Sequence, residues 1–222
     1  MKYQLKIKLL SDATFGRGDG VAGLIDQEVE HDVYGFPYLR GRTIKGLLSE
    51  ECDNLIAILP DLNHVNFWEK LACTLFGMPG SKLEKMAAMH IGDACLPDDL
   101  REAVAYEIYN QKITTQEVLN SLTAIRRQTA IDLQDGTADE GSLRSFRVAI
   151  RKLEFKADLS FEIQPTNEML SLLAAGTLGL RRLGSGRNRG RGHVQCTLHD
   201  RDGNEITQRY VKLFGKIGEK IS

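Results

Sequence analysis

Arginine and glycine are concentrated in residues 179–194, whose sequence is GLRRLGSGRNRGRGHV. Glycine lets the backbone turn freely and approach a ligand closely, and successive exposed N–H groups can form an anion-binding nest. Arginine adds planar, bidentate donors that suit phosphate. A flexible solvated loop is the alternative interpretation. We predict that phosphate or RNA binds to this stretch, through Gly184, Gly186, Arg187, Arg189, Gly190 and Arg191.

Acidic residues alternate with other types in a second stretch, residues 23–46, which then becomes basic. On an extended backbone the carboxylates of Asp26, Glu28, Glu30 and Asp32 would lie on one side. Alone, such a run is typical of a solvated face. The residues after it surround a predicted helix N-terminus, which is itself an anion site. Carboxylates beside a phosphate site are the layout of a phosphodiester-cleaving centre, with RNA contacts predicted for Arg40, Arg42, Thr43 and Lys45.

The elements that position these stretches follow from hydrophobic periodicity. Period-2 alternation predicts a strand over residues 2–10, and short strands are expected at 89–96 and 193–200. Helices are predicted from Thr43 to Pro60 and over 66–76, 98–122 and 167–180. A long loop with an extended piece at 26–34 separates the first strand from the first helix. Residues 123–164 are expected to form one long hairpin turning around residues 135–141.

This order of elements predicts an α+β fold with a split βαβ, ferredoxin-like sheet, related to that of RNA-recognition motifs. We expect a single domain over residues 1–222, with inserted segments at about 97–146. Arg126 and Arg127 precede the hairpin and are predicted to line an RNA path, although paired arginines beside a strand are also common surface residues. Phe146 and Phe155 are candidates for base stacking or for the core.

Composition excludes several classes of protein. The chain has 222 residues, 42% of them hydrophobic, and a formal charge of −1, which argues against a protein that coats nucleic acid over its whole surface. No apolar run is long enough for a membrane span, and the N-terminus does not resemble a signal peptide. Four scattered cysteines are expected to be buried, reduced thiols. We therefore expect a cytoplasmic protein without membrane contact.

The sequence GFPYLRGRTIKG, residues 35–46, resembles the Gly-x-Pro-x-x-Pro-Gly-Ser-Ser-x-Lys-Gly signature of the RAMP superfamily, the RNA-binding subunits of type III CRISPR effector complexes in prokaryotes. Further similar segments follow in the family's order. They are TLFG at 74–77, MHIGDACLP at 89–97, residues 129–155 and the glycine-arginine stretch. The segment GLIDQEVEHD at 23–32 is similar to the family's Gly-Gly-x-Asp…Arg-Asp pattern. The resemblance covers most of the chain.

The resemblance implies a modified ferredoxin-like palm that holds guide RNA along its sheet and glycine-rich loop, with a hairpin thumb separating guide from target. It also implies that Asp26, at the family's catalytic position, supports cleavage of target RNA to a 2′,3′-cyclic phosphate. A carboxylate is a weak base at neutral pH, so we predict that Asp26 holds a divalent metal, Mg²⁺. His31 and Asp32 are candidates for catalytic support. The implied partners are guide RNA, target RNA, other effector subunits, and copies of this chain or related RAMP subunits.

Two positions depart from the signature, because Arg40 and Arg42 stand where proline and serine are usual. Two alternatives stand beside the cleaving backbone subunit, and the extra charge near the guide favours the first of them. One is a non-catalytic subunit that caps the 5′ tag of the guide or lengthens the filament. The other is an endoribonuclease that processes guide RNA without a metal.

Overall fold

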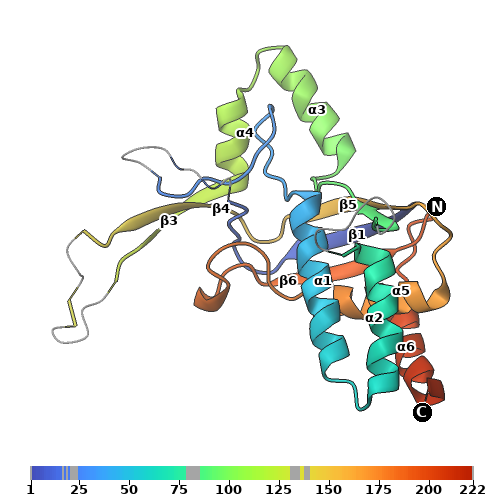
Figure 1. Ribbon diagram of the computed structural model, residues 1–222. Coiled ribbons are helices and arrows are strands. Elements are labelled where there is room, and N and C mark those ends of the chain that lie inside the picture. The colour runs from blue at the N-terminus through green and yellow to red at the C-terminus, as the bar shows by residue number, and fades with distance from the viewer. Residues whose placement is uncertain are drawn as a thin grey trace.

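The computed structural model describes residues 2–16, 18, 20, 25–78, 86–130, 136–137 and 141–221. Its centre is a four-stranded sheet in the order β2-β5-β1-β6 (Figure 1). The strands are β1 (Lys2–Leu9), β2 (Met89–Ile91), β5 (Glu154–Phe161) and β6 (Val194–His199). All neighbours are antiparallel, so β1 is parallel to β2 and β5 to β6. This is the split βαβ sheet, and the predicted fold class is confirmed.

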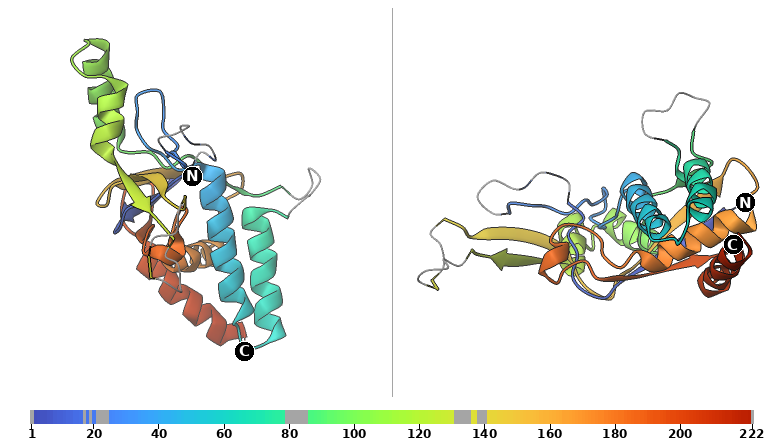
Figure 2. Two further views of the ribbon diagram at one scale, coloured as in Figure 1. Left: turned by 90° about the vertical axis from the view of Figure 1, so that its left-hand side faces the viewer. Right: turned by 60° about the horizontal axis from the view of Figure 1, so that its bottom comes forward.

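Four helices gather beside this sheet, away from the two-stranded ribbon described below (Figures 1 and 2). They are α1 (Gly41–Ala57), α2 (Leu62–Phe76), α5 (Asn167–Gly179) and α6 (Thr207–Ile221). The side chains of β1 alternate, since Leu5 and Ile7 are buried whereas Lys8 on the opposite face is exposed. The buried residues join those of α1, α5 and β6 in one hydrophobic core.

The segment 98–122 was predicted as one helix, and this is wrong in one respect. It forms two helices, α3 (Asp98–Tyr109) and α4 (Thr115–Leu122). Gln111 has a φ of 57°, a left-handed conformation that ends α3. Thr114 then starts α4 with a capping box, in which its side chain accepts from the N–H of Glu117 and the Glu117 carboxylate accepts from the N–H of Thr114.

The predicted single hairpin over residues 123–164 is also wrong. Strand β3 (Thr123–Gln128) pairs only with β4 (Arg144–Ala149). Together they form a separate two-stranded ribbon that projects away from the central sheet (Figure 1). A turn in which Lys152 has a φ of 76° separates β4 from β5, which belongs to the central sheet. Residues 135 and 138–140 of the predicted turn lie outside the described residues.

The remaining expectations concern membranes and cysteines. In the described part of the chain, no helix has the length and apolar character needed to span a membrane. The cysteines are free, but they are not all buried as expected. Cys52 and Cys196 are buried, Cys95 is intermediate and Cys73 is exposed on α2.

Candidate nucleic-acid interface

The glycine-arginine loop runs from the end of α5 to β6 and depends on its glycines. Gly184, Gly186, Gly190 and Gly192 all have φ between 71° and 79°, which favours glycine. A Cβ on Gly184 would lie 2.4 Å from the carbonyl oxygen of Thr14, and one on Gly192 would lie 1.9 Å from that of Leu183. Gly184 therefore lies tightly against the first loop and Gly192 against the start of its own loop, while Arg187 and Arg189 lie on a 3-10 turn, η2 (Arg187–Arg189).

Backbone hydrogen bonds fix the glycine-arginine loop to residues 12–14. The N–H of Ser185 donates to the carbonyl of Thr14 at 3.0 Å, and the N–H of Gly192 donates to that of Asp12 at 2.8 Å. The hydroxyl of Ser185 also donates to Oε1 of Gln27 at 2.8 Å. Two segments far apart in the sequence thus form one surface.

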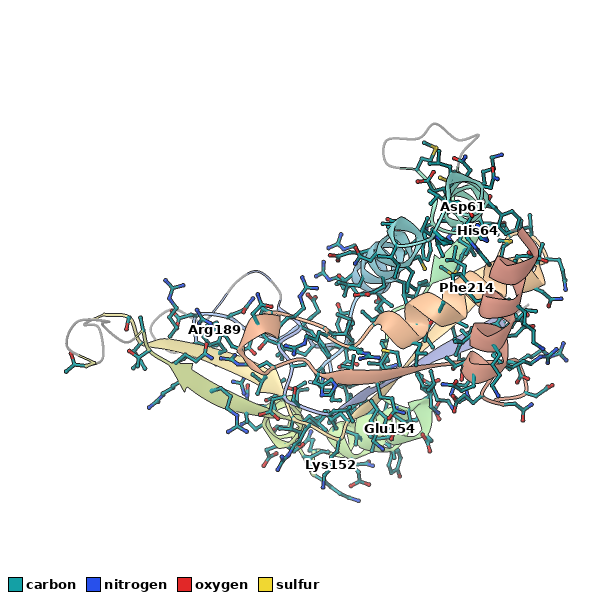
Figure 3. The ribbon with its side chains drawn as sticks, turned by 90° about the horizontal axis from the view of Figure 1, so that it is seen from below. Asp61, His64, Lys152, Glu154, Arg189 and Phe214 are labelled. Atoms are coloured by element: carbon teal, nitrogen blue, oxygen red, sulfur yellow. The ribbon has the colours of Figure 1, made fainter. Side chains whose placement is uncertain are left out.

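The β3–β4 ribbon completes this junction on its other side. Arg126 of β3 lies opposite Phe146 of β4, and the guanidinium carbon of Arg191 lies 4.7 Å from the centre of the Phe146 ring. Arg126 pairs with Asp12 at 2.8 Å. Arg189 lies beside the ribbon (Figure 3), with its Nη1 3.4 Å from Oε1 of Gln128.

Three hollows follow one another along the junction and share lining residues. The first has about 540 Å³ and is lined by Gln128, Phe146, Gly184, Ser185, Gly186, Arg187, Asn188, Arg189 and Arg191. The second has about 520 Å³ and shares Gln128 and Arg191 with the first; its other lining residues are Leu10, Ser11, Asp12, Arg126, Arg127, Arg151 and Gly190. The third has about 270 Å³, shares Gly184 and Ser185 with the first, and reaches Gln27, Arg40 and Thr43. We call this continuous band the junction groove.

Most of the residues predicted to bind RNA line the junction groove, and their binding role stays a prediction. Arg42 and Lys45 line none of the three hollows. Arg42 is exposed on the first turn of α1. Lys45 is half-buried, and burial lowers the pKa of its ammonium group.

Positive charge is concentrated in the groove near Arg191. Burial lowers the pKa of the Arg191 guanidinium, and the nearby charges of Arg189 and Arg126 lower it further. Asp12 opposes this shift, but its carboxylate already pairs with Arg126 and accepts the backbone N–H of Arg151 at 3.0 Å. A bound anion would relieve this repulsion.

Asp26 is exposed at the edge of the ribbon, where the first loop runs beside β4. Its N–H donates to the carbonyl of Ser145 at 2.8 Å, and its Oδ2 accepts the N–H of Ser145 at 2.6 Å. Gln27, the next residue, lines the third hollow. Asp26 itself lines none of the three hollows and has no ion pair with another described residue. Its exposed carboxylate lies one residue along the chain from the junction groove and anchors the first loop to the ribbon.

The other three carboxylates of the run pair with three different arginines. Nε of Arg147 lies 2.8 Å from Oε1 of Glu28, and both side chains are nearly buried. Nη2 of Arg40 lies 2.6 Å from Oε1 of Glu30. Nη2 of Arg101 lies 2.9 Å from Oδ2 of Asp32. The four carboxylates thus do not gather into one cluster.

His31 and Asp32 lie along the extended segment from Asp26, held by bridges at Gln27, Val29 and His31. Five extended residues span about 16 Å, so His31 is distant from the Asp26 carboxylate. Nδ1 of His31 lies 3.0 Å from the carbonyl oxygen of Asp32, and Asp32 accepts the N–H groups of Tyr34 and Phe36. Their supporting catalytic role is therefore not favoured by position, and it stays a prediction.

A divalent metal fits at Asp26 only if water and substrate phosphates supply most of its ligands. The described residues contain no group of three or more histidine, cysteine, aspartate or glutamate side chains placed to hold a metal. Mg²⁺, however, commonly uses one or two carboxylates, with water and substrate phosphates supplying its other ligands. Asp26 fits such a site, because its Oδ1 has no hydrogen-bond partner among the described residues while Oδ2 holds the N–H of Ser145.

The N-terminus of α1 differs from the prediction of an open anion site. The helix begins at Gly41, not near Thr43, and Arg40 is its N-cap. The N–H of Gly41 donates to the carboxylate of Asp93 at 2.7 Å, so an internal anion already occupies part of this end. Since Arg40 pairs with Glu30, the departure from proline at this position adds less charge to the groove than expected.

Replacing Glu28 with glutamine should lower the free energy of unfolding by about 3 kcal/mol, because a nearly buried Arg147 would lose its counter-charge. Denaturant unfolding measures the change. The matched control is Glu154→Gln, whose pair with Lys8 has side chains 58% and 49% exposed, so a change below about 1 kcal/mol is expected. Equal losses in the two variants would contradict a structural role for the Glu28–Arg147 pair.

Several residues at the junction of the three segments carry no signal in the sequence. Asp12, Gln27, Gln128 and Arg147 were not singled out, because their partners lie far away in the sequence; Asp12 and Arg126, for example, are 114 positions apart. Phe146 and Phe155, considered together as candidates for stacking or core, have different environments. Phe155 is 1% exposed in the core, whereas Phe146 is half-buried and lines the first hollow.

The comparisons with known proteins agree with this architecture. The model of the RAMP superfamily matches residues 6–195. In a cryo-EM structure of type III-B Cmr-beta bound to cognate target RNA, one chain is 12% identical with a TM-score of 0.63, and the match covers 95% of this chain and 99% of that one. In the apo state of type III-B Cmr-beta, a chain is 13% identical with a TM-score of 0.61, covering 89% and 97%. Among curated proteins, none matches the sequence.

Proposed function

The chain belongs to the RAMP superfamily, and we propose that it is a type III CRISPR effector subunit that binds guide RNA and cleaves guide-paired target RNA. The observation that carries the proposal is the junction groove, lined by arginines and left-handed glycines, with the exposed Asp26 next in the chain to its lining residue Gln27. The likeness of fold to a chain of type III-B Cmr-beta, in a structure with cognate target RNA, supports it.

Guide RNA would follow the junction groove, with its phosphates held by Arg187 and Arg189 and by open N–H groups of the glycine-arginine loop. These arginines are exposed on η2 and line the first hollow. The loop is fixed to the first loop by hydrogen bonds and contacts the ribbon through Arg189 and Arg191, so it offers a preformed surface. The β3–β4 ribbon would act as the thumb that separates guide from target.

Asp26 would support cleavage at the edge of this surface. The 2′-hydroxyl of the target gives up its proton to water and its oxygen bonds to the adjacent phosphorus. The bond from this phosphorus to the 5′-oxygen breaks and the 5′-oxygen takes up a proton from water, which gives a 2′,3′-cyclic phosphate and a 5′-hydroxyl. Asp26 would hold Mg²⁺ through its free Oδ1, and the metal when bound would offset negative charge on the phosphate. The hydrogen bond from Ser145 to Oδ2 keeps the carboxylate in place.

A non-catalytic capping or filament subunit is a second candidate, favoured by one observation. The Asp26 carboxylate already accepts a hydrogen bond from the N–H of Ser145. An aspartate at this position therefore has a structural role even in a subunit that does not cleave RNA. Guide processing without a metal is the third.

The test is to purify the complex with its RNA, sequence that RNA, and incubate the complex with target RNA complementary to the guide. We expect bound guide RNA, several copies of this subunit, and target cleavage that stops in EDTA. One copy without cleavage would assign the capping role. Specific cutting of repeat RNA by the isolated chain in EDTA would assign guide processing, and absence of any bound RNA would contradict the proposal as a whole.

A further inference from the structure

The first hollow has an aromatic ring in its wall, which a site for phosphate alone would not require. Phe146 is half-buried on β4 and lines the hollow together with Arg191. The Arg191 guanidinium carbon lies 4.7 Å from the centre of the ring, within the distance of a cation–π contact. The ring and the guanidinium thus form one unit in the hollow.

Arg191 contacts the ring and is not paired with a carboxylate of the described residues. Asp12, which opposes the lowering of its pKa, pairs with Arg126 and accepts the N–H of Arg151. Among the described residues Arg191 has no ion pair of its own. Its side chain lines both the first and second hollows and so stands between them, with its planar group supported by Phe146.

The surroundings suit a nucleobase in size and in polarity. The hollow has about 540 Å³, within the range of roughly 300–1,000 Å³ that is usual for small-ligand pockets. Gln128 and Asn188 line it and could bond to the edge of a base, since amides both donate and accept. Arg187 and Arg189 lie in the same wall, where they can reach phosphates on either side of such a base.

We infer that Arg191 and Phe146 form a stacking platform for one unpaired RNA base, which lies against the guanidinium while Arg187 and Arg189 hold the neighbouring phosphates. Unpaired bases stack on aromatic rings and on arginine planes in many RNA-binding proteins. The inference rests on the proposed function, because it assigns a part of the bound RNA to one place in the junction groove. The platform would bind a base, whereas Arg187 and Arg189 would bind phosphates by charge.

The experiment measures binding of the purified full chain to two probes, a ten-nucleotide oligoadenylate and an abasic ribose-phosphate strand of equal length. The unaltered chain should bind oligoadenylate at least about fivefold more tightly. Phe146→Leu should weaken oligoadenylate binding about tenfold, with abasic binding and the salt dependence of both unchanged. Arg191→Lys, which keeps the charge but loses the plane, should act in the same direction.

Two further variants serve as controls. Phe146→Tyr keeps an aromatic ring and should bind as the unaltered chain does, which separates loss of stacking from loss of folding. Arg187→Ala should weaken both probes equally and reduce the salt dependence.

Equal binding of the two probes by the unaltered chain would overturn the platform while leaving RNA binding intact. Equal losses on both probes in Phe146→Leu would also overturn it, since the residue would then only support the loop. Failure of the unaltered chain to bind either probe, while the complex also lacks RNA, would contradict the proposed function itself.

Discussion

Replacing Asp26 with asparagine should reduce metal-dependent cleavage of target RNA by the assembled complex about 100-fold or more, because a metal contributes several kcal/mol to charge stabilisation. Asparagine keeps an oxygen that can accept the N–H of Ser145, as Oδ2 of Asp26 does at 2.6 Å. The first loop should therefore stay anchored to β4. Guide and target binding should be unchanged, which gel-shift and cleavage assays on the same preparation can measure.

A comparison with Asp26→Ala separates the two roles of the carboxylate. Alanine removes both the charge and the side-chain hydrogen bond to Ser145 but keeps the backbone one, so it should abolish cleavage and also lower stability. If the asparagine variant cuts normally and only the alanine variant fails, Asp26 is an anchor and the catalytic role is wrong. Glu162→Gln is the matched control, because this glutamate has a side chain 71% exposed at the end of β5 and its variant should cut at the normal rate.

The central sheet could be predicted from the sequence because local patterns and tertiary packing agree there. Leu5, Ile7 and Leu9 alternate with polar residues, and the structure buries the same three residues. The helix α5 was also predicted, since its apolar residues continue for most of its length and it is buried on nearly every side. Where one face or one whole element enters the core, hydrophobicity alone indicates its place.

The ribbon and the C-terminal helix show where such patterns fail. The segments that form β4 and β5 alternate in the same way, and the break between them is at Lys152, a residue with no turn preference that has a φ of 76°. Partner choice decides the break, since β4 pairs with β3 whereas β5 pairs with β1 and β2. Helix α6 was missed although its Phe214 packs against Trp68 with ring centres 4.5 Å apart.

The candidate site was predictable in composition and not in arrangement. Clustered arginines and glycines indicated an anion-binding loop, and four of those glycines have the left-handed φ that such a loop needs. The same reasoning grouped Asp26 with Glu28, Glu30 and Asp32 as equals. Only the fold brings Arg147, Arg40 and Arg101 to the last three and leaves Asp26 exposed, because ion pairs between distant segments have no local signal.

Replacing Arg187, Arg189 and Arg191 together with alanine should weaken RNA binding in a salt-dependent way. If Arg187 and Arg189 each engage one phosphate of single-stranded RNA while Arg191 stacks against a base, the slope of log K against log salt should fall in magnitude by about 1.4. For lines that meet near 1 M salt, the lost phosphate contacts then weaken binding about 25-fold at 0.1 M and about tenfold at 0.2 M. Loss of the Arg191 plane adds a further factor that does not depend on salt. A salt titration of RNA retention measures both quantities.

The matched control removes three exposed lysines far from the junction groove, Lys70 of α2 and Lys212 and Lys216 of α6, on the helical side away from the ribbon (Figures 1 and 2). The two triple variants change the net charge equally, so a general loss of attraction would affect them alike. If the arginines of the loop bind the RNA directly, only the arginine variant should show a smaller slope of log K against log salt. Identical slopes in both would show that overall charge, and not the glycine-arginine loop, retains the RNA.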